Sequence, residues 1–355
     1  MSAPQARTLG RAGDALRAAV RMRAWRVHSY GAAGAEPAAE LRLEEARVPP
    51  LRAPDELLVR VHAASLNPLD VAMLGGYGAR VLNALRALEG GEGVEFPLVA
   101  GRDFVGVVER AGAGSRLRPG QRVWGVVPPH RQGSHAEFVV VRDSWAGAAP
   151  RALADAAAGG ALYAGLTARA LVRAAAPGAG ARVLVLGLGG VGQAALQLLA
   201  RGGARVLVGC SAPLVARALA LGAEDAFDRH APDYDARLES AGPYDVILDC
   251  AGLGGWEASA RRWRYGRYVT LTTPLLREAD ERGLGAGFAS AAFSLLAQNA
   301  RAMRASAALA PSAATMLPHV RWAYFMPCAG DIEELRRLAE AGQVRRGAGA
   351  AVHSQ

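Results

Sequence analysis

Residues 182–211 read RVLVLGLGGVGQAALQLLARGGARVLVGCS, and the pattern is that of a strand, a glycine turn, a helix and a second strand. A run of Val and Leu leads into the turn GLGGVG, and apolar residues at helical spacing follow it. In such a turn the first glycine permits the tight bend, the second lets backbone N–H groups approach a pyrophosphate, and the third brings the helix close to the strand. The stretch therefore predicts a dinucleotide-binding βαβ unit that contacts its cofactor at Gly187, Gly189, Gly190, Val191 and Gly192.

The residues after the second strand indicate which dinucleotide binds. An NAD site has an acidic residue about 20 residues after the first glycine, because a carboxylate accepts from the ribose 2′-OH. Here that strand ends at Cys210 and Ser211, and the next acid is Glu224, a full helix later. Ser211 can donate to a 2′-phosphate, and Arg217 can offset its charge, although a solvated helix position explains Arg217 equally well. The sequence predicts a preference for NADPH over NADH.

Length and composition limit the class of protein. The 355 residues are enough for two domains with cores of their own, and the 51% hydrophobic and 21% charged content is usual for an α/β protein. No apolar run is long enough to predict a transmembrane helix. All 41 basic residues are Arg, and Ala and Gly are abundant, which indicates a GC-rich coding sequence. The net charge of +9 is therefore not evidence of a nucleic-acid-binding surface. Since no basic run is interleaved with aromatic residues, we expect no nucleic-acid partner.

The first 22 residues differ from the rest of the chain. They carry four basic residues and one acid, with apolar residues between them at helical spacing: Arg7, Arg11, Arg17 and Arg21, and Asp14. This composition is typical of a mitochondrial transit peptide, which we expect over residues 1–22. The alternatives are an unstructured N-terminal extension, or a true start at Met22.

The chain before and after the glycine turn has two different patterns. Strand-like runs at 24–28, 56–63, 106–110, 121–126 and 136–141, separated by Gly and Pro and without long helices, predict a small barrel-like β domain. A helix at 152–176 then leads into the glycine turn. Beyond it, strands at 226–228, 244–249, 268–272 and 321–326 alternate with helices at 213–221, 234–240 and 256–265, and residues 277–318 read as helical with a loop. This alternation predicts a doubly wound parallel sheet that binds its ligand beyond the carboxyl ends of the strands.

Several motifs carry a resemblance to a known family. They are HAASLNPLD at 62–70, GRDFVG at 101–106, PGQRV at 119–123, GSHAE at 133–137 and LTA at 166–168. Together with the glycine turn, they resemble the zinc-independent quinone oxidoreductase branch of the medium-chain dehydrogenase/reductase family. The resemblance implies an α/β fold with a GroES-like β-rich catalytic domain over 23–152, a Rossmann NADPH-binding domain over 153–326, and a return to the first domain over 327–355.

The resemblance also implies a function. It implies a mitochondrial oxidoreductase that transfers hydride from NADPH to a quinone or enone substrate and is connected with ubiquinone biosynthesis. It further implies a homodimer, a place in the matrix and peripheral association with the inner membrane. No metal is expected, since GRD stands where zinc-dependent members have GHE, and the three cysteines, Cys210, Cys250 and Cys328, are too scattered for a zinc cluster.

The family pattern places Asn67 and Tyr77 at the nicotinamide edge as candidate catalytic residues. Thr167, Cys250 and Thr272 are the further candidates for cofactor contact. Three of these residues have a structural alternative. Asn67 can be a turn residue, Tyr77 a gate or packing residue, and Thr167 an interior helix residue.

Neighbouring charged residues are expected to act in the structure rather than in the chemistry. Asp70 is expected to fix its local turn. Arg102 and Asp103 are expected to form a structural ion pair.

The C-terminus departs from the family pattern after Arg345. The family continues with a strand, a helix and a last strand, whereas here GAGAAVHSQ follows, and we expect an uncovered sheet edge in the first domain. This departure leaves open a non-catalytic NADPH-binding interaction protein. A reductase of enoyl thioesters or other activated alkenes also stays open beside the quinone reductase, because it shares the fold and the tyrosine.

Overall fold

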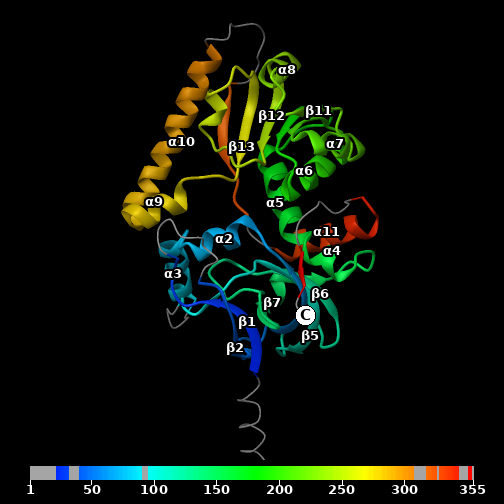
Figure 1. Ribbon diagram of the computed structural model, residues 1–355, viewed down its shortest axis with the longest axis vertical. Helices are drawn as coiled ribbons and strands as arrows, with labels where there is room; N and C mark the ends of the chain where they lie inside the picture. The colour runs from blue at the N-terminus through cyan, green and yellow to red at the C-terminus, as the bar shows by residue number, and fades with distance from the viewer. Residues whose placement is uncertain are drawn as a thin grey trace, which may run out of the picture.

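The computed structural model describes residues 21–31, 40–89, 95–307, 317–325, 328–343 and 351–353. Figure 1 shows two lobes, with the first strands of the chain in the lower lobe and the glycine-turn helix in the upper one. The predicted transit peptide lies almost entirely outside the described residues. None of the described helices is long and apolar enough to cross a membrane.

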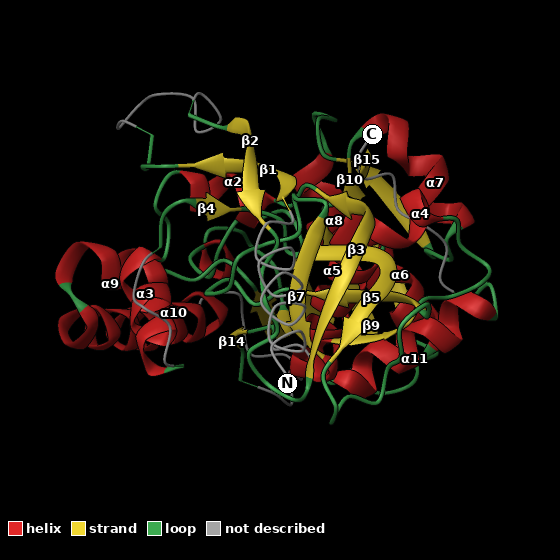
Figure 2. Cartoon of the chain, turned by 90° about the horizontal axis from the view of Figure 1, so that it is seen from below, coloured by secondary structure: helices red, strands yellow, loops and turns green. Residues whose placement is uncertain are grey.

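The first lobe consists of two antiparallel sheets (Figure 2). One has the order β2-β1-β4, and the other has the order β15-β3-β5-β6-β8, with β7 pairing on β3. Their bounds are β1 (Arg21–Val27), β2 (Arg42–Arg47), β3 (Glu56–Ser65), β4 (Leu98–Val99), β5 (Asp103–Ala111), β6 (Arg122–Val126), β7 (Phe138–Arg142), β8 (Ala146–Ala148) and β15 (Ala351–His353). β1 alternates between exposed and buried residues because only one of its faces meets the core, whereas β3 is buried on both faces.

Two helices interrupt the first lobe, contrary to the prediction from its sequence. They are α2 (Pro68–Leu74) and α3 (Ala79–Leu88). Asn67 is the N-cap of α2, Pro68 fits its first turn, and the Asp70 carboxylate accepts from the Asn67 backbone N–H at 2.8 Å. The role predicted for Asp70, fixing its local turn, is confirmed.

The second lobe is built on a parallel sheet of order β11-β10-β9-β12-β13-β14. Its strands are β9 (Arg182–Leu186), β10 (Arg205–Cys210), β11 (Asp225–Asp228), β12 (Tyr244–Asp249), β13 (Tyr265–Thr270) and β14 (His319–Trp322). The helices are α5 (Leu162–Ala175), α6 (Gly190–Arg201), α7 (Val215–Ala220) and α8 (Tyr234–Ala241), whereas the preceding α4 (Asp155–Gly159) packs on β3 and β5 of the first lobe. The strand order reverses between β9 and β12, as in a dinucleotide-binding fold, and the predicted fold class is confirmed.

The helix predicted at 256–265 is wrong. Only a short 3-10 turn, η3 (Glu257–Ser259), forms there, and β13 begins at Tyr265 opposite Tyr244 of β12. The reason is tertiary: Tyr265 is buried at the start of β13 and its hydroxyl donates to the Ala258 carbonyl at 2.7 Å, so residues 260–264 form an irregular connection into the strand. The helical prediction at 277–318 is confirmed as far as Ala307, by α9 (Leu275–Arg282) and α10 (Leu284–Ala307).

The end of the chain returns to the first lobe. Helix α11 (Ala329–Glu340) packs Ile332, Leu335 and Leu338 into a core that includes Trp124 of β6. β15 then pairs antiparallel with β3, from Ala351 opposite Ser65 to His353 opposite Ala63. The expected uncovered edge is therefore occupied over these three pairs, because the short final segment supplies a strand.

Candidate active site

The glycine turn has the geometry that its sequence predicts. Gly187 has a φ of +89°, which favours glycine. A Cβ on Gly192 would lie 2.0 Å from the Gly187 carbonyl oxygen, so only glycine allows the helix to approach the strand this closely. A Cβ on Gly189 would meet nothing within 4 Å, which leaves open space in front of the turn.

The turn opens onto the N-terminus of α6. Gly189 is the N-cap and has no side chain to satisfy the first backbone N–H groups of the helix. These N–H groups and the positive end of the helix dipole attract an anion. The open space, the free donors and the dipole fit the pyrophosphate of a dinucleotide.

The loop after β12 lies beside this turn. The buried Asp249 carboxylate accepts from the backbone N–H groups of Ala251 at 3.1 Å and Gly254 at 2.7 Å, which fixes the loop. Cys250 lies next to Gly192, and burial raises the pKa of its thiol. Thr272, which follows β13, lies beside the same loop, as the sequence predicts. Its hydroxyl oxygen would be 3.6 Å from a Cβ added to Gly252.

Ser211 lies where the ribose of a dinucleotide is expected. It follows β10 directly, is half-buried, and is the N-cap of a short 3-10 turn, η2 (Ala212–Leu214). Arg217 lies farther along on the exposed side of α7. Both positions agree with the sequence analysis, and neither is tested as a phosphate contact.

A second arginine near Ser211 was missed by the sequence analysis. Asp228 pairs with Cys210 in the sheet, and the backbone N–H of Arg229 donates to the Cys210 carbonyl at 2.7 Å. Arg229 thus follows β11 at the point where Ser211 follows β10, and its side chain is exposed. The available signal was its place one residue after the third strand, since adjacent parallel strands end at the same edge of a sheet.

Asn67 lies at the edge of the first lobe, at the end of a hydrogen-bonded chain. It is half-buried, and its Nδ2 donates to Ser65 Oγ at 3.0 Å. Ser65 Oγ in turn donates to the buried Asp103 carboxylate at 2.7 Å. Burial raises the pKa of Asp103 to about 7, against the opposing effect of the Ser65 hydrogen bonds. The chain holds the Asn67 amide in one orientation.

Thr167 is buried in α5. Its hydroxyl donates to the Tyr163 carbonyl of the same helix at 2.7 Å, as expected for an interior helix threonine. Tyr163 also lies close to Asp103. Its backbone N–H donates a hydrogen bond to the Asp103 carboxylate, which lowers the pKa of that group. The structure thus brings Thr167 and Asn67 to the same region through Tyr163, Asp103 and Ser65.

Tyr77 lies in the first lobe and faces the second. It is half-buried, and burial is the largest of the effects that raise the pKa of its phenol. The next largest is the negative charge of the Asp280 carboxylate in α9. Arg277, also in α9, acts in the opposite direction, and Tyr324, which follows β14, also contributes. Tyr77 therefore lies near α9 and the segment after β14, which belong to the nucleotide-binding lobe.

Comparisons with known proteins agree with this architecture. Residues 53–156 match the alcohol dehydrogenase GroES-like domain. The Drosophila melanogaster protein NAD(P)H oxidoreductase RTN4IP1, mitochondrial, is 39% identical over 340 residues, which cover 91% of this chain and 78% of that protein. The chain belongs to the RTN4IP1-type NAD(P)H oxidoreductases of the medium-chain dehydrogenase/reductase family.

Two more distant relatives of this medium-chain reductase help to define the family. The Aspergillus terreus trans-enoyl reductase pgmF is 30% identical over 211 residues, which cover 56% of each chain. The quinone oxidoreductase from Coxiella burnetii has a TM-score of 0.70 at 22% identity and covers 92% of this chain and 90% of its own, which shows a shared fold. Membership of the family places the chain among NAD(P)H oxidoreductases.

The ion pair predicted between Arg102 and Asp103 is wrong for this medium-chain reductase. Arg102 instead lies 3.4 Å from Asp70, Nε to Oδ1, and both side chains are fully buried. Arg102 lies in the bend just before β5 and turns toward Asp70 of α2, whereas Asp103, the first residue of β5, turns toward Ser65. Among the described residues, no three His, Cys, Asp or Glu side chains gather as ligands for a metal ion.

Proposed function

We propose that this chain is an NADPH-dependent oxidoreductase that transfers hydride to a quinone-like acceptor. One observation carries the proposal: an open glycine turn at a helix N-terminus, with Ser211 and no acid after the second strand. A 2′-phosphate is accommodated by a hydroxyl donor and nearby arginines, whereas a carboxylate would repel it. Arg229, beside Ser211, adds a cation that NADH does not need.

The residues of the turn hold the cofactor rather than react with it. The N–H groups at the start of α6 bind the diphosphate, and Thr167, Cys250 and Thr272 line the side of the site that receives the nicotinamide. A bound dihydronicotinamide supplies the hydride. The chain contributes orientation and the exclusion of water, which together lower the barrier.

The acceptor gains negative charge on its carbonyl oxygen as the hydride arrives, and donors aimed at that oxygen stabilise the transition state. Asn67 Nδ2 has two hydrogens and gives one to Ser65, so the other serves the acceptor or the nicotinamide ribose. The Tyr77 hydroxyl is protonated at neutral pH, as the ordinary pKa of a phenol requires, and burial raises that pKa further, so it serves as a hydrogen-bond or proton donor.

A reductase of enoyl thioesters is the second candidate function. It needs the same cofactor site and a proton donor at Tyr77, and one relative carries the name trans-enoyl reductase. A non-catalytic NADPH-binding protein is a third candidate, and it is distinguished by the absence of turnover.

The deciding experiment titrates the purified chain with NADPH and NADH by fluorescence, and then follows NADPH oxidation with 1,4-benzoquinone and with a trans-2-enoyl thioester. We expect NADPH to bind roughly tenfold more tightly than NADH and benzoquinone to be reduced. Turnover with the thioester alone supports the enoyl reductase instead. Binding without turnover of either acceptor supports the non-catalytic protein, and equal affinities contradict the 2′-phosphate assignment.

We also propose that the chain acts in the mitochondrial matrix, in ubiquinone biosynthesis, with residues 1–22 as its transit peptide. The relatives' names include the word mitochondrial, and the basic, acid-poor N-terminus supports the same compartment. Fractionation of cells expressing the full chain tests the compartment. A lowered ubiquinone content after deletion of the gene tests the biosynthetic connection.

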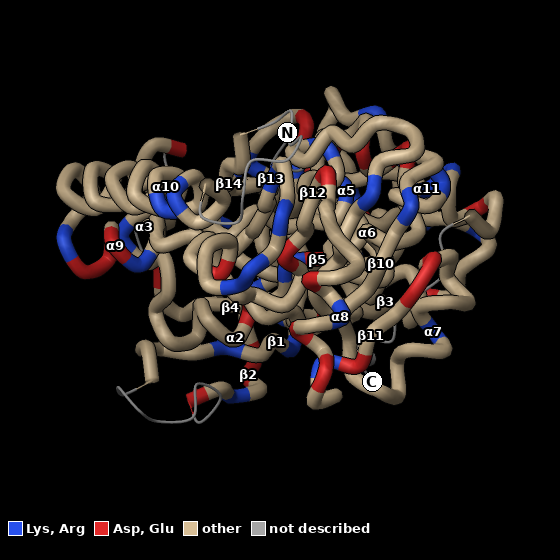
Figure 3. Tube along the Cα trace, turned by 90° about the horizontal axis from the view of Figure 1, so that it is seen from above, with Lys and Arg blue, Asp and Glu red and all other residues tan. Residues whose placement is uncertain are grey.

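Two associations complete the proposal. The edge strand β14 supports a homodimer formed by joining the two parallel sheets, which light scattering tests. Helix α10 supports peripheral binding to the inner membrane, because most of it is uncharged (Figure 3) and it exposes Phe288, Phe293, Leu296 and Met303. Flotation with anionic vesicles tests this association.

A further inference from the structure

A carboxylate of the second lobe caps a helix of the first. Asp280 in α9 accepts from the backbone N–H of Gly78 at 2.6 Å and from that of Arg80 at 3.0 Å. Helix α3 begins between these residues, and its N-cap, Gly78, has no side chain of its own to satisfy the free N–H groups. In Figure 1, α9 lies beside α3 where the lobes meet. The cap is thus provided by a residue about 200 positions away.

Tyr77 lies directly before this cap, between two glycines. Gly76 and Gly78 have φ values of +86° and +80°, a region in which glycine has much backbone freedom. Backbone hydrogen bonds form the turn, including one from the Tyr77 N–H to the Ala72 carbonyl at 3.1 Å, but the two glycines supply no side chain that anchors it to the rest of the molecule.

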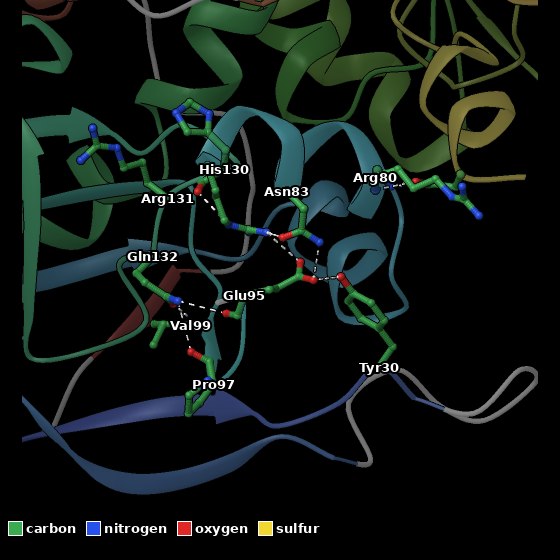
Figure 4. Close-up of polar contacts among 12 residues, drawn as sticks. Tyr30, Arg80, Asn83, Glu95, Pro97, Val99, His130, Arg131 and Gln132 are labelled. Carbon is green, nitrogen blue, oxygen red and sulfur yellow. Dashed lines mark hydrogen bonds and ion pairs between the residues drawn. The ribbon is translucent and has the colours of Figure 1, made fainter. Parts of the chain in front are cut away.

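Contacts from two sides hold the segment instead. On one side the ring of Tyr30 lies under Gly76, where an added Cβ would be 3.2 Å away. Figure 4 shows that Tyr30 and Asn83 both point toward the Glu95 carboxylate, which also pairs with the buried Arg86 at 3.0 Å. On the other side is Asp280.

We propose that Asp280 is a positioning residue for Tyr77: by capping α3 from across the cleft, it fixes the Tyr77 segment against the nucleotide-binding lobe. The inference rests on the proposed function, in which Tyr77 serves the acceptor. It adds a residue that the family motifs do not indicate and that belongs to the opposite lobe. The neighbouring Leu276 supports the same contact, since its Cδ1 would lie 3.2 Å from a Cβ on Gly78.

The electrostatics agree that Asp280 lies close to the Tyr77 phenol. Burial raises the pKa of Tyr77 most, the Asp280 carboxylate raises it further, and Arg277 on the same helix lowers it.

The test compares Asp280→Ala and Asp280→Asn with Glu281→Gln, a matched control at the adjacent, exposed acid of α9. Backbone hydrogen exchange over residues 74–82 is measured by mass spectrometry, together with kcat, KM for benzoquinone and the Kd for NADPH. We expect Asp280→Ala to exchange faster over this segment and to lose roughly tenfold in kcat, while the Kd for NADPH changes less than about twofold. Asp280→Asn keeps an oxygen that accepts from one N–H group and is expected to recover part of kcat, whereas Glu281→Gln behaves as the wild type.

Four results overturn the inference. Unchanged exchange in Asp280→Ala means that the cap does not form in solution. Faster exchange with an unchanged kcat means that the contact is structural only, and an equal loss of NADPH affinity means that the lobes, rather than Tyr77, have been disturbed. A wild-type chain without turnover overturns the proposed function and this role together, whereas an active wild type with an equally active Asp280→Ala overturns this role alone.

Discussion

The choice between NADPH and NADH depends on single side chains after β10 and β11. We predict that Ser211→Asp lowers the affinity for NADPH by roughly tenfold or more, since the new carboxylate repels a 2′-phosphate, and that it leaves NADH binding unchanged or stronger. Arg229→Ala is expected to weaken NADPH binding and leave NADH binding unaffected, because only the phosphate needs the cation. Fluorescence titration with both cofactors measures the two affinities. A parallel loss for NADPH and NADH in either variant would show damage to the fold instead of a change in selectivity.

Asp103 gives a second prediction for a single residue, on the pH dependence of stability. Its pKa is raised from 3.8 to about 7 in the folded chain, so the folded state binds more protons than the unfolded state between these pH values. The free energy of unfolding therefore falls as pH rises through this range, by at most about 1.4 kcal/mol for each pH unit. Asp103→Asn does not titrate, so the stability of the wild type relative to this variant is expected to fall between pH 5 and pH 7 and to level off above pH 7.

Urea unfolding of both proteins at pH 5, 6, 7 and 8 measures this difference. Glu333→Gln is the matched control, because hydrogen bonds from Arg336 and Arg337 lower the pKa of Glu333 to about 2. The difference between the wild type and that variant should stay constant over the same range. A constant difference for Asp103→Asn as well would mean that Asp103 is ionised throughout.

At the scale of one element, the glycine turn separates a residue needed for binding from one needed for folding. Gly189 has a φ of −72° and open space where a Cβ would lie, so Gly189→Ala should fold normally but bind NADPH roughly tenfold more weakly, since its methyl group enters the pyrophosphate site. Gly192→Ala places a Cβ 2.0 Å from a backbone oxygen and should cost about 1–3 kcal/mol of stability. Thermal melts and NADPH titrations of both variants test the contrast, and equal melting temperatures would contradict it.

Elements with a strong local signal could be predicted from the sequence. The strand predicted at 244–249 has the bounds of β12, and the turn at 187–192 lies where its motif indicates. The local signal failed where packing decides: the segment before Tyr265 contains helix-forming residues but forms only a short 3-10 turn and an irregular connection into β13. Helix α11 has a signal that was overlooked, since Ile332, Leu335 and Leu338 recur at helical spacing.

The candidate site divides in the same way. The glycine turn, Asn67 and Tyr77 could be found because motifs mark them. Asp280 could not, because its importance arises from a cap on a segment about 200 residues away. Arg229 had only a weak signal, its place after the third predicted strand, because it is the pairing of β11 with β10 that brings it beside Ser211. No local pattern encodes such contacts.

At the scale of the whole molecule, the two lobes share a core. Helices α5 and α11, from the later part of the chain, pack Leu166 and Leu335 against Trp124 and Val126 of the first lobe. Arg169 of α5 also pairs with Asp331 of α11 at 2.8 Å. Unfolding of α11 should therefore destabilise the first lobe and its packing against α5.

Leu335→Ala tests this coupling. Leu335 is 4% exposed, so we expect the substitution to cost about 2–5 kcal/mol and to lower the melting temperature, because it leaves a cavity where α11 meets α5. Leu296→Ala on α10 is the matched control: the same atoms are removed from a side chain that is 69% exposed, and the cost should stay within about 0.5 kcal/mol. Hydrogen exchange should rise in β6 as well as in α11 of Leu335→Ala, because both contribute to the shared core. A rise confined to α11 would show that the helix unfolds independently and that the first lobe is stable without it.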